Sequence, residues 1–208
     1  MCITIAQFQC FVAYFPISFY NYGKSPEVTL MLYVIPVIAV CALLFAVYLA
    51  FSVKKEEEGT DRMKEIAGAI REGANAFLFS EYKVLVIFAA VLFMVIGIGI
   101  GNWITAVCFL IGAIFSTLAG FFGMRIATDA NVRTANAART SGMAKALTVA
   151  YHGGAVMGFS VVGLGLLGVS AIYLITGNAD VLFGYSLGAS SVALFARVGG
   201  VSIRRPRT

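Results

Sequence analysis

Long runs of apolar residues, separated by short polar stretches, dominate the hydrophobicity pattern of this chain. Five runs reach the length of about 20 residues that a helix needs to cross a hydrocarbon core of about 30 Å. They lie near residues 29–53, 84–101, 103–128, 144–176 and 179–200. Because backbone polar groups in lipid must be satisfied within their own segment, all five runs are predicted to be helices. The pattern predicts an all-α membrane protein with about five transmembrane helices.

The basic residues between these runs predict the orientation. Two polar stretches, after the first and third runs, hold most of the lysines and arginines: Lys54, Lys55, Arg62, Lys64, Arg71, Lys83, Arg125, Arg133, Arg139 and Lys145. The opposite side holds Lys24 before the first run and Asp180 between the fourth and fifth. Because lysine and arginine are enriched in cytoplasmic loops, the N-terminus is predicted to lie outside and both polar stretches in the cytoplasm.

The polar stretch before the second run is predicted to contain an amphipathic helix. Thr60 suits an N-cap, and Asp61 complements the helix dipole in the first turn. Apolar side chains then recur at helical spacing, at Met63, Ile66, Ala67, Ile70, Ala74, Phe77 and Leu78. The charged run at residues 54–65 is interpreted as a solvated cytoplasmic surface.

The composition excludes an ordinary soluble domain. Hydrophobic residues make up 60% of the chain and charged residues 12%, and 208 residues cannot bury so much apolar surface in a soluble core. Arg204, Arg205 and Arg207 supply three charges of the net +5. The other basic residues flank apolar runs and form no patch, so no nucleic-acid partner is expected.

Glycines spaced four residues apart predict close helix packing. Such pairs let helix backbones approach where hydrophobicity gives no driving force between helices. The pairs are Gly97 and Gly101, Gly154 and Gly158, and Gly184 and Gly188. We expect these helices to have more neighbours than five spans provide.

The sequence contains no complete hydrolytic site. Hydrolysis needs a nucleophile with its base, a metal cluster or a phosphate cradle. The single histidine, His152, stands alone, and the acidic residues lack the converging spacing that would hold Mg²⁺. No catalytic or metal-binding residue is predicted in this chain.

The polar run at residues 125–139 follows the third apolar run directly. Its candidate functional residues are Arg125, Asn131 and Arg133, which could line a cytoplasmic entrance or brace the site of a larger protein. The alternative is a close-packed helical extension that is anchored by its positive charges. The residues by themselves leave both interpretations open.

Arg197 lies deep in the fifth apolar run, with no acidic residue near it in the sequence. An arginine inside a span is costly unless a partner or a water-filled path satisfies it, which makes Arg197 a candidate functional residue. The alternative is a side chain that extends to the cytoplasmic surface at a helix end.

Four segments together carry a family resemblance. They are IREGANAFL at 70–78, FFGMRIATDANVRTANAA at 121–138, GGAVMGFSVVGLGLLGVS at 153–170 and SLGASSVALFARVGG at 186–200. In this order the chain resembles the membrane-integral, ion-pumping pyrophosphatases over residues 30–200. The resemblance implies an N-terminal part of a homodimeric pump with about sixteen helices per subunit. Such a pump hydrolyses Mg²⁺-pyrophosphate at the cytoplasmic face and transports protons or sodium ions.

The resemblance also implies roles for single residues and a location. Arg197 matches the family arginine of the ion gate that couples hydrolysis to transport, with partners on later helices. The family motifs that contact pyrophosphate and Mg²⁺ would follow position 200, so this chain alone is expected to bind no Mg²⁺ and to be inactive. We expect a multi-pass protein of a bacterial-type inner membrane.

Both ends of the chain depart from the family pattern. Residues 1–26 are interpreted as an atypical extension, and residues 201–208 as an aberrant basic tail. Codons for this tail can be chosen that, read one base away, give Gly-Ile-Tyr-Thr-Lys-Ala-Ala-Asp, the family continuation. The tail therefore favours a one-base frameshift.

Two other functions remain open. One is a short non-enzymatic membrane protein that acts by packing its helices against a partner. The other is a small channel or transporter, which would need paired polar residues within the membrane.

Overall fold

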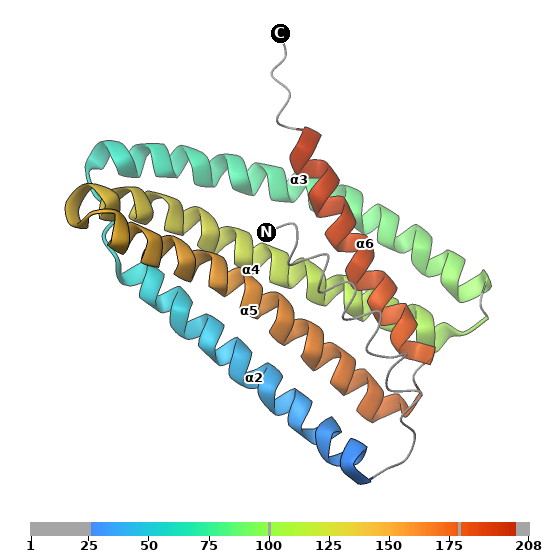
Figure 1. Cartoon of the computed structure of the whole chain (residues 1–208). Helices are drawn as coiled ribbons and strands as arrows, with labels where there is room; N and C mark the ends of the chain where they lie inside the picture. The colour runs from blue at the N-terminus through green and yellow to red at the C-terminus, as the bar shows by residue number, and fades with distance from the viewer. Residues whose placement is uncertain (1–25, 100, 179, 203–208) are drawn as a thin grey trace. The chain divides into compact units, whose positions relative to one another are not determined.

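Helices form almost all of the described chain. The computed structural model describes residues 26–99, 101–178 and 180–202, with side chains from 33 to 194 within these ranges. The helices are α2 (Pro26–Lys55), α3 (Asp61–Gly99), α4 (Trp103–Ser141), α5 (Met143–Thr176) and α6 (Asp180–Ser202) (Figure 1). No strand occurs within these ranges, and the prediction of an all-α protein is confirmed.

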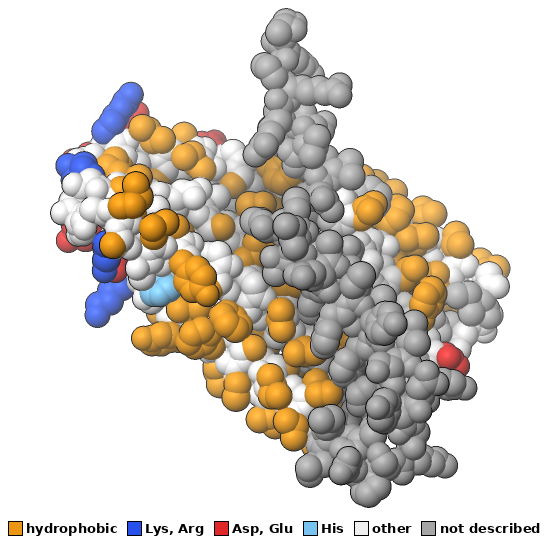
Figure 2. Space-filling model, viewed as in Figure 1, with side chains coloured by type: hydrophobic (Ala, Val, Ile, Leu, Met, Phe, Trp, Pro, Cys, Tyr) orange, Lys and Arg blue, Asp and Glu red, His pale blue; other side chains and the backbone are white. Residues whose placement is uncertain are grey.

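Four helices are long and apolar enough to cross a membrane. They comprise Tyr33–Lys55, Asp61–Gly99, Trp103–Ser141 and Met143–Thr176. In α6 the described side chains form a shorter apolar helix, Asp180–Leu194. Hydrophobic side chains cover much of the visible surface (Figure 2), as expected of a surface that meets lipid or further helices. The division into five spans and the orientation stay predictions.

Two of the helices are much longer than a membrane is thick. Both α3 and α4 have 39 residues, which corresponds to about 58 Å at about 1.5 Å per residue, against a hydrocarbon core of about 30 Å. The predicted amphipathic helix and second apolar run are one continuous helix, α3. The polar run at residues 125–139 likewise continues α4 without a break.

A single residue separates α4 from α5. Gly142 has a φ of 83°, a left-handed conformation that glycine adopts without the steric cost of a Cβ. Next to this turn, Ala137 of α4 packs against Ala146 and Val149 of α5. The pairing of the two helices therefore begins directly at the turn.

The chain divides into two compact units. Unit 1 comprises Met1–Ala39, Ser80–Thr117 and Leu164–Thr208, and unit 2 comprises Val40–Phe79 and Leu118–Gly163. In unit 2, Leu49 of α2, Ile126 of α4 and Val156 of α5 form a buried cluster. The sequence-based extension at residues 1–26 and the tail at 201–208 lie almost entirely outside the described residues.

Tyr185 of α6 is the central residue of unit 1. Its side chain is almost fully buried and packs against Cys108 of α4 and Val169 of α5. The phenol donates a hydrogen bond to the carbonyl oxygen of Leu164 at 3.2 Å. A Cβ at Gly168 would overlap the Tyr185 side chain, so α5 admits this ring only because it has glycine there.

The predicted glycine pairs have three different outcomes. Gly184 and Gly188 lie against the backbone of α4, which confirms close packing for that pair. Gly101 lies in the turn between α3 and α4, so the pair with Gly97 is not a helix-packing motif and that prediction is wrong. At Gly154 and Gly158 a Cβ would meet no described atom within 4 Å.

Candidate functional site

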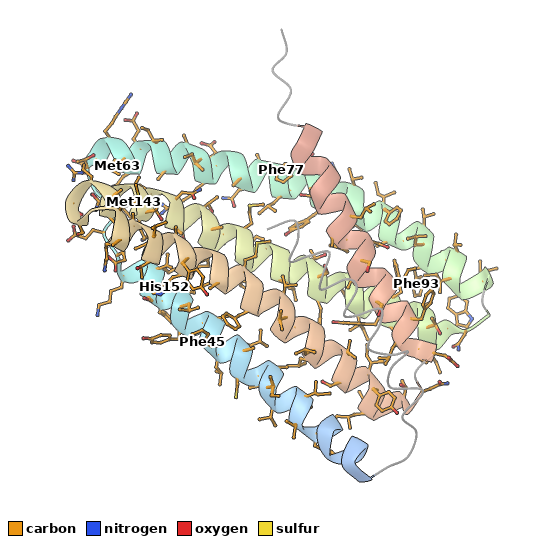
Figure 3. The ribbon with its side chains drawn as sticks, viewed as in Figure 1. Phe45, Met63, Phe77, Phe93, Met143 and His152 are labelled. Carbon is orange, nitrogen blue, oxygen red and sulfur yellow. The ribbon has the colours of Figure 1, made fainter. Side chains whose placement is uncertain are left out.

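The segment between α2 and α3 is held by ionic and polar side chains of unit 2. Charged side chains gather at the end of unit 2 that carries this segment (Figure 2). Figure 3 shows Met63 of α3 and Met143 of α5 at the same end, and His152 farther along α5. We call the set of connected residues the polar clamp: Glu56, Glu58, Arg71, Asp129, Arg133, Asn136 and Lys145.

Arg133 of α4 is the buried centre of the polar clamp. Only 8% of the residue is exposed. Its Nε donates to the carbonyl oxygen of Glu56 at 3.0 Å, and its Nη2 donates to Glu58 Oε1 at 3.0 Å. Its Nη1 donates to the carbonyl oxygen of Asp129, one turn earlier in α4, at 2.8 Å. The rigid guanidinium fork thus fixes the α2–α3 segment to α4.

Arg71 of α3 makes the second set of charged hydrogen bonds. Its Nη2 donates to Glu58 Oε1 at 2.6 Å, and its Nε donates to Asp129 Oδ1 at 2.7 Å. Glu58 therefore accepts from two arginines on different helices. Charge-assisted hydrogen bonds of this length are the strong ones, so Glu58 joins α3 to α4.

Asn136 and Lys145 complete the polar clamp. The Asn136 side-chain amide donates to the carbonyl oxygen of Glu57 at 3.2 Å, and Lys145 Nζ of α5 donates to Glu56 Oε1 at 2.6 Å. Gly59 has a φ of 89°, and a Cβ there would lie 2.7 Å from Asn136 Oδ1. Glycine is therefore required both by the backbone conformation and by the close approach of Asn136.

The polar clamp is expected to loosen at acidic pH. The hydrogen bond from Arg71, aided by the charges of Arg71 and Arg133, holds the pKa of Glu58 below its ordinary value of 4.5. A carboxylate with a lowered pKa stabilises the fold above 4.5, and this contribution is lost as the pH falls through the lowered pKa. Hydrogen exchange of the amides at residues 56–60, corrected for the intrinsic pH effect, should accelerate in that window.

The control for this pH dependence is Glu58→Gln, which cannot titrate. Its amide exchange should be faster than wild type at neutral pH and should lack the added acceleration at acidic pH. An unchanged pH profile in Glu58→Gln would show that another group causes the loosening.

The three residues predicted in the polar run of α4 have different surroundings. Arg125 is exposed, with its guanidinium 5.8 Å from the centre of the Phe121 ring. Asn131 is exposed as well. Arg133 is the only one of the three in the polar clamp, where its neighbours Ala130 and Ala137 are also buried.

Arg197 lies in α6, and its side chain falls outside the described residues. At about 100° per residue, position 197 falls within about 60° of Leu194 and about 140° from Val192. Leu194 is exposed, whereas Val192 is buried against Leu85 and Ala113. Position 197 therefore lies closer to the helix face of Leu194 than to that of Val192.

The acidic partners in the polar clamp were not predicted from the sequence. The interpretation of residues 54–65 as a solvated surface is wrong for Glu56 and Glu58, whose side chains are 33% and 26% exposed and form ion pairs. Arg71 and Asp129 lie within two of the four segments that carry the family resemblance. Membership of these segments was the one sequence feature that could have pointed to the pair. Spacing could not, because 58 residues separate the two partners.

The polar clamp is not suited to bind Mg²⁺. Among the described residues, no three His, Cys, Asp or Glu side chains gather as a metal site. The clamp carboxylates Glu56, Glu58 and Asp129 each accept a hydrogen bond from lysine or arginine. The charge of each carboxylate is thus already paired with a cationic side chain, through one of its two oxygens.

The comparisons with known proteins agree on one family. The sequence profile described as inorganic H⁺ pyrophosphatase matches residues 40–202. A Clostridium tetani protein, provisionally named a K(+)-stimulated pyrophosphate-energized sodium pump, is 56% identical over 162 residues, which are 77% of this chain and 24% of that protein.

Two further relatives are named for different ions. The K(+)-insensitive pyrophosphate-energized proton pump of Methanosarcina mazei is 43% identical over 171 residues, covering 82% of this chain and 25% of its own. The K(+)-stimulated pyrophosphate-energized sodium pump of Thermotoga maritima is 42% identical over 196 residues, which are 83% of this chain and 26% of that protein. The chain spans about a quarter of the length of these relatives.

Proposed function

Because this chain belongs to the inorganic H⁺ pyrophosphatase family, we propose that it is the N-terminal part of a pump that couples pyrophosphate hydrolysis to ion transport. A relative named as a proton pump and one named as a sodium pump match 82% and 83% of this chain. Similarity over this part does not separate the two ions. The transported ion in our proposal is therefore a proton or a sodium ion, carried across a bacterial-type inner membrane.

The polar clamp braces the predicted cytoplasmic end of this pump. The observation that carries this proposal is the burial of Arg133 and the direction of its hydrogen bonds toward Glu56 and Glu58. A buried guanidinium that is paired with carboxylates holds its helices together, because moving them apart would leave a buried charge without a partner. The clamp would keep α3 and α4 in fixed register. Arg125 and Asn131, which are exposed, would face the cytoplasmic approach to the site.

Arg197 is proposed as a residue of the ion gate. The residue lies within positions 40–202, which the family profile matches, and this supports the proposal. An arginine within a membrane requires partners or water. Arg197 would couple hydrolysis to ion transport and would not contact the reacting phosphate.

Pyrophosphate and Mg²⁺ would be bound by other parts of the complete protein. The carboxylates of the polar clamp are engaged by lysine and arginine, so we assign no metal and no step of hydrolysis to them. The complete protein is proposed to be a homodimer in the lipid bilayer. The 208-residue chain by itself is proposed to be inactive.

A chimeric pump tests this function. Residues 40–202 would replace the matching segment of the Clostridium tetani relative, and pyrophosphate hydrolysis and ion uptake would be measured in vesicles. We expect both activities in the chimera, and no hydrolysis above empty vesicles for the 208-residue chain alone. The same chimera with Arg197→Ala should lose ion uptake to a greater degree than hydrolysis.

Two outcomes would contradict the proposal. Hydrolysis by the isolated 208-residue chain would show that it holds its own substrate site. A chimera that is inserted, dimeric and resistant to protease but inactive would favour the alternative of a non-enzymatic protein that packs against a partner.

A further inference from the structure

The end of α2 carries two lysines that pair with no other residue in the described part of the chain. Lys54 and Lys55 lie in its last turn, and both are exposed. The other lysines and arginines of unit 2 each have a partner, which is a carboxylate, the Asn136 amide or the Phe121 ring. Two positive charges of unit 2 are therefore available to an anion from outside the described chain.

A row of exposed apolar side chains leads along α2 to these lysines. Leu44, Tyr48 and Phe51 are 65%, 67% and 69% exposed. At about 100° per residue, these three positions and position 55 fall within an arc of about 60° on one side of the helix. We call Leu44, Tyr48, Phe51 and Lys55 the α2 stripe. The stripe joins an apolar surface to a cationic end.

The apolar surface beside the α2 stripe continues onto α5. The ring of Phe45 stacks on that of Tyr48 with 6.2 Å between centres, and it meets the ring of Phe159 on α5 edge to face at 5.0 Å. Hydrophobic side chains lie next to His152 in this part of the surface, with lysine or arginine side chains just beyond them (Figure 2). Both helices of unit 2 therefore contribute to the surface.

The length and charge of this surface fit a phospholipid. From position 44 to position 55, α2 rises about 16 Å, which is about half of a hydrocarbon core of about 30 Å. An acyl chain of one leaflet can therefore lie along the apolar positions while its phosphate reaches the lysines. Lysines beside a membrane surface favour anionic lipids. An apolar protein helix in the same place would cover the stripe but supply no anion for the lysines.

We propose that the α2 stripe, together with Lys54, binds an anionic phospholipid. The phosphate would contact the two lysines, and an acyl chain would lie along Leu44, Tyr48 and Phe51. Neutral phospholipids have the same acyl chains but no net negative charge, so the lysines should distinguish anionic from neutral lipids. This binding depends on the membrane character of the chain and does not depend on pump activity.

Quenching of a tryptophan in the stripe by brominated lipids tests the proposal. In the full 208-residue chain, Trp103→Phe removes the one native tryptophan, and Phe51→Trp places a reporter at an exposed position of the stripe. Bromine on an acyl chain quenches an indole that it contacts. Vesicles of phosphatidylcholine and phosphatidylglycerol are compared with bromine on one lipid or on the other. The ratio of the two association constants measures the preference for the anionic lipid.

Phosphatidylglycerol should be preferred about fivefold or more at low salt, and the preference should fall in about 1 M sodium chloride. The double variant Lys54→Gln, Lys55→Gln should bring the ratio close to unity, whereas Lys54→Arg, Lys55→Arg should keep the preference. The matched control is Lys64→Gln, which removes the same charge from an exposed lysine of α3 that pairs with Asp61. This control should leave the ratio unchanged.

Three results would overturn the site. Equal quenching by the two lipids would show that the stripe faces lipid without selecting a headgroup. Quenching by neither lipid would show that a second copy of the chain covers the stripe. A loss of preference in Lys64→Gln as large as in the double glutamine variant would show a general effect of net charge. The same reporter in the chimeric pump should keep the preference, and its loss there would overturn the site for the complete protein.

Discussion

Replacing Arg133 with alanine is expected to open the α2–α3 segment to protease. The change removes three hydrogen bonds and leaves the carbonyl oxygen of Glu56 without its donor, while Glu58 keeps Arg71. Charged hydrogen bonds at partly buried sites contribute about 2–3 kcal/mol. The initial rate of tryptic cleavage at Lys54 and Lys55, measured in lipid nanodiscs, should rise about thirtyfold to a hundredfold.

Two variants of α4 separate the polar clamp from general effects of charge. Arg125→Ala removes the same side chain from an exposed position of the same helix and should change the cleavage rate less than about twofold. Arg133→Lys keeps the charge but loses the planar guanidinium, so its cleavage rate should lie between those of the wild type and Arg133→Ala. Equal cleavage rates in Arg133→Ala and Arg125→Ala would show that Arg133 does not hold the segment.

Replacing Gly188 with valine is expected to separate α6 from α4. A Cβ at Gly188 would overlap the carbonyl oxygen of Phe109 and lie 3.1 Å from the backbone nitrogen of Ala113. Backbone atoms cannot yield as a flexible side chain does, so α6 must move outward. Overpacking of this kind costs about 1–3 kcal/mol and occasionally more.

Cys108 reports this displacement, because it is buried against Val181, Leu182 and Tyr185 of α6. The assay uses a chain in which Cys2, Cys10 and Cys41 are serine and follows modification by a membrane-permeant maleimide. Gly188→Val should raise the rate of modification about tenfold or more, and Gly188→Ala should raise it less.

The matched control is Gly154→Ala, where a new Cβ meets no described atom within 4 Å. Because alanine is the better helix former by about 0.5–1 kcal/mol, this variant should be neutral or slightly stabilising. An increase in Cys108 modification as large as that of Gly188→Val would refute the specific contact between α6 and α4.

The same glycines show how far a sequence pattern predicts packing. Gly154 and Gly158 have the same spacing as Gly184 and Gly188, yet among the residues that the structure describes only the second pair lies against another helix. Spacing places two glycines on one helix face but does not state which neighbour covers that face. In the complete pump a further helix is expected there, which matches the expectation that these helices need more neighbours.

The sequence by itself determined the helices and their membrane character. Apolar runs of sufficient length predicted the membrane-spanning part of each observed helix, because a helix satisfies its own backbone hydrogen bonds. The structure showed that α3 and α4 continue well beyond the runs at 84–101 and 103–128. The four segments at residues 70–78, 121–138, 153–170 and 186–200 together indicated the family. These properties are local, or depend on residue identity at fixed spacing.

Only the tertiary structure decided which charged residues act together. Arg71 pairs with Asp129 across 58 residues, and Arg133 pairs with Glu58 across 75. A sequence gives the charge of each side chain but not its partner, since pairing depends on which helices lie side by side. The glutamates at 56–58 were therefore predicted to be solvated, although the fold buries much of Glu58 between two arginines.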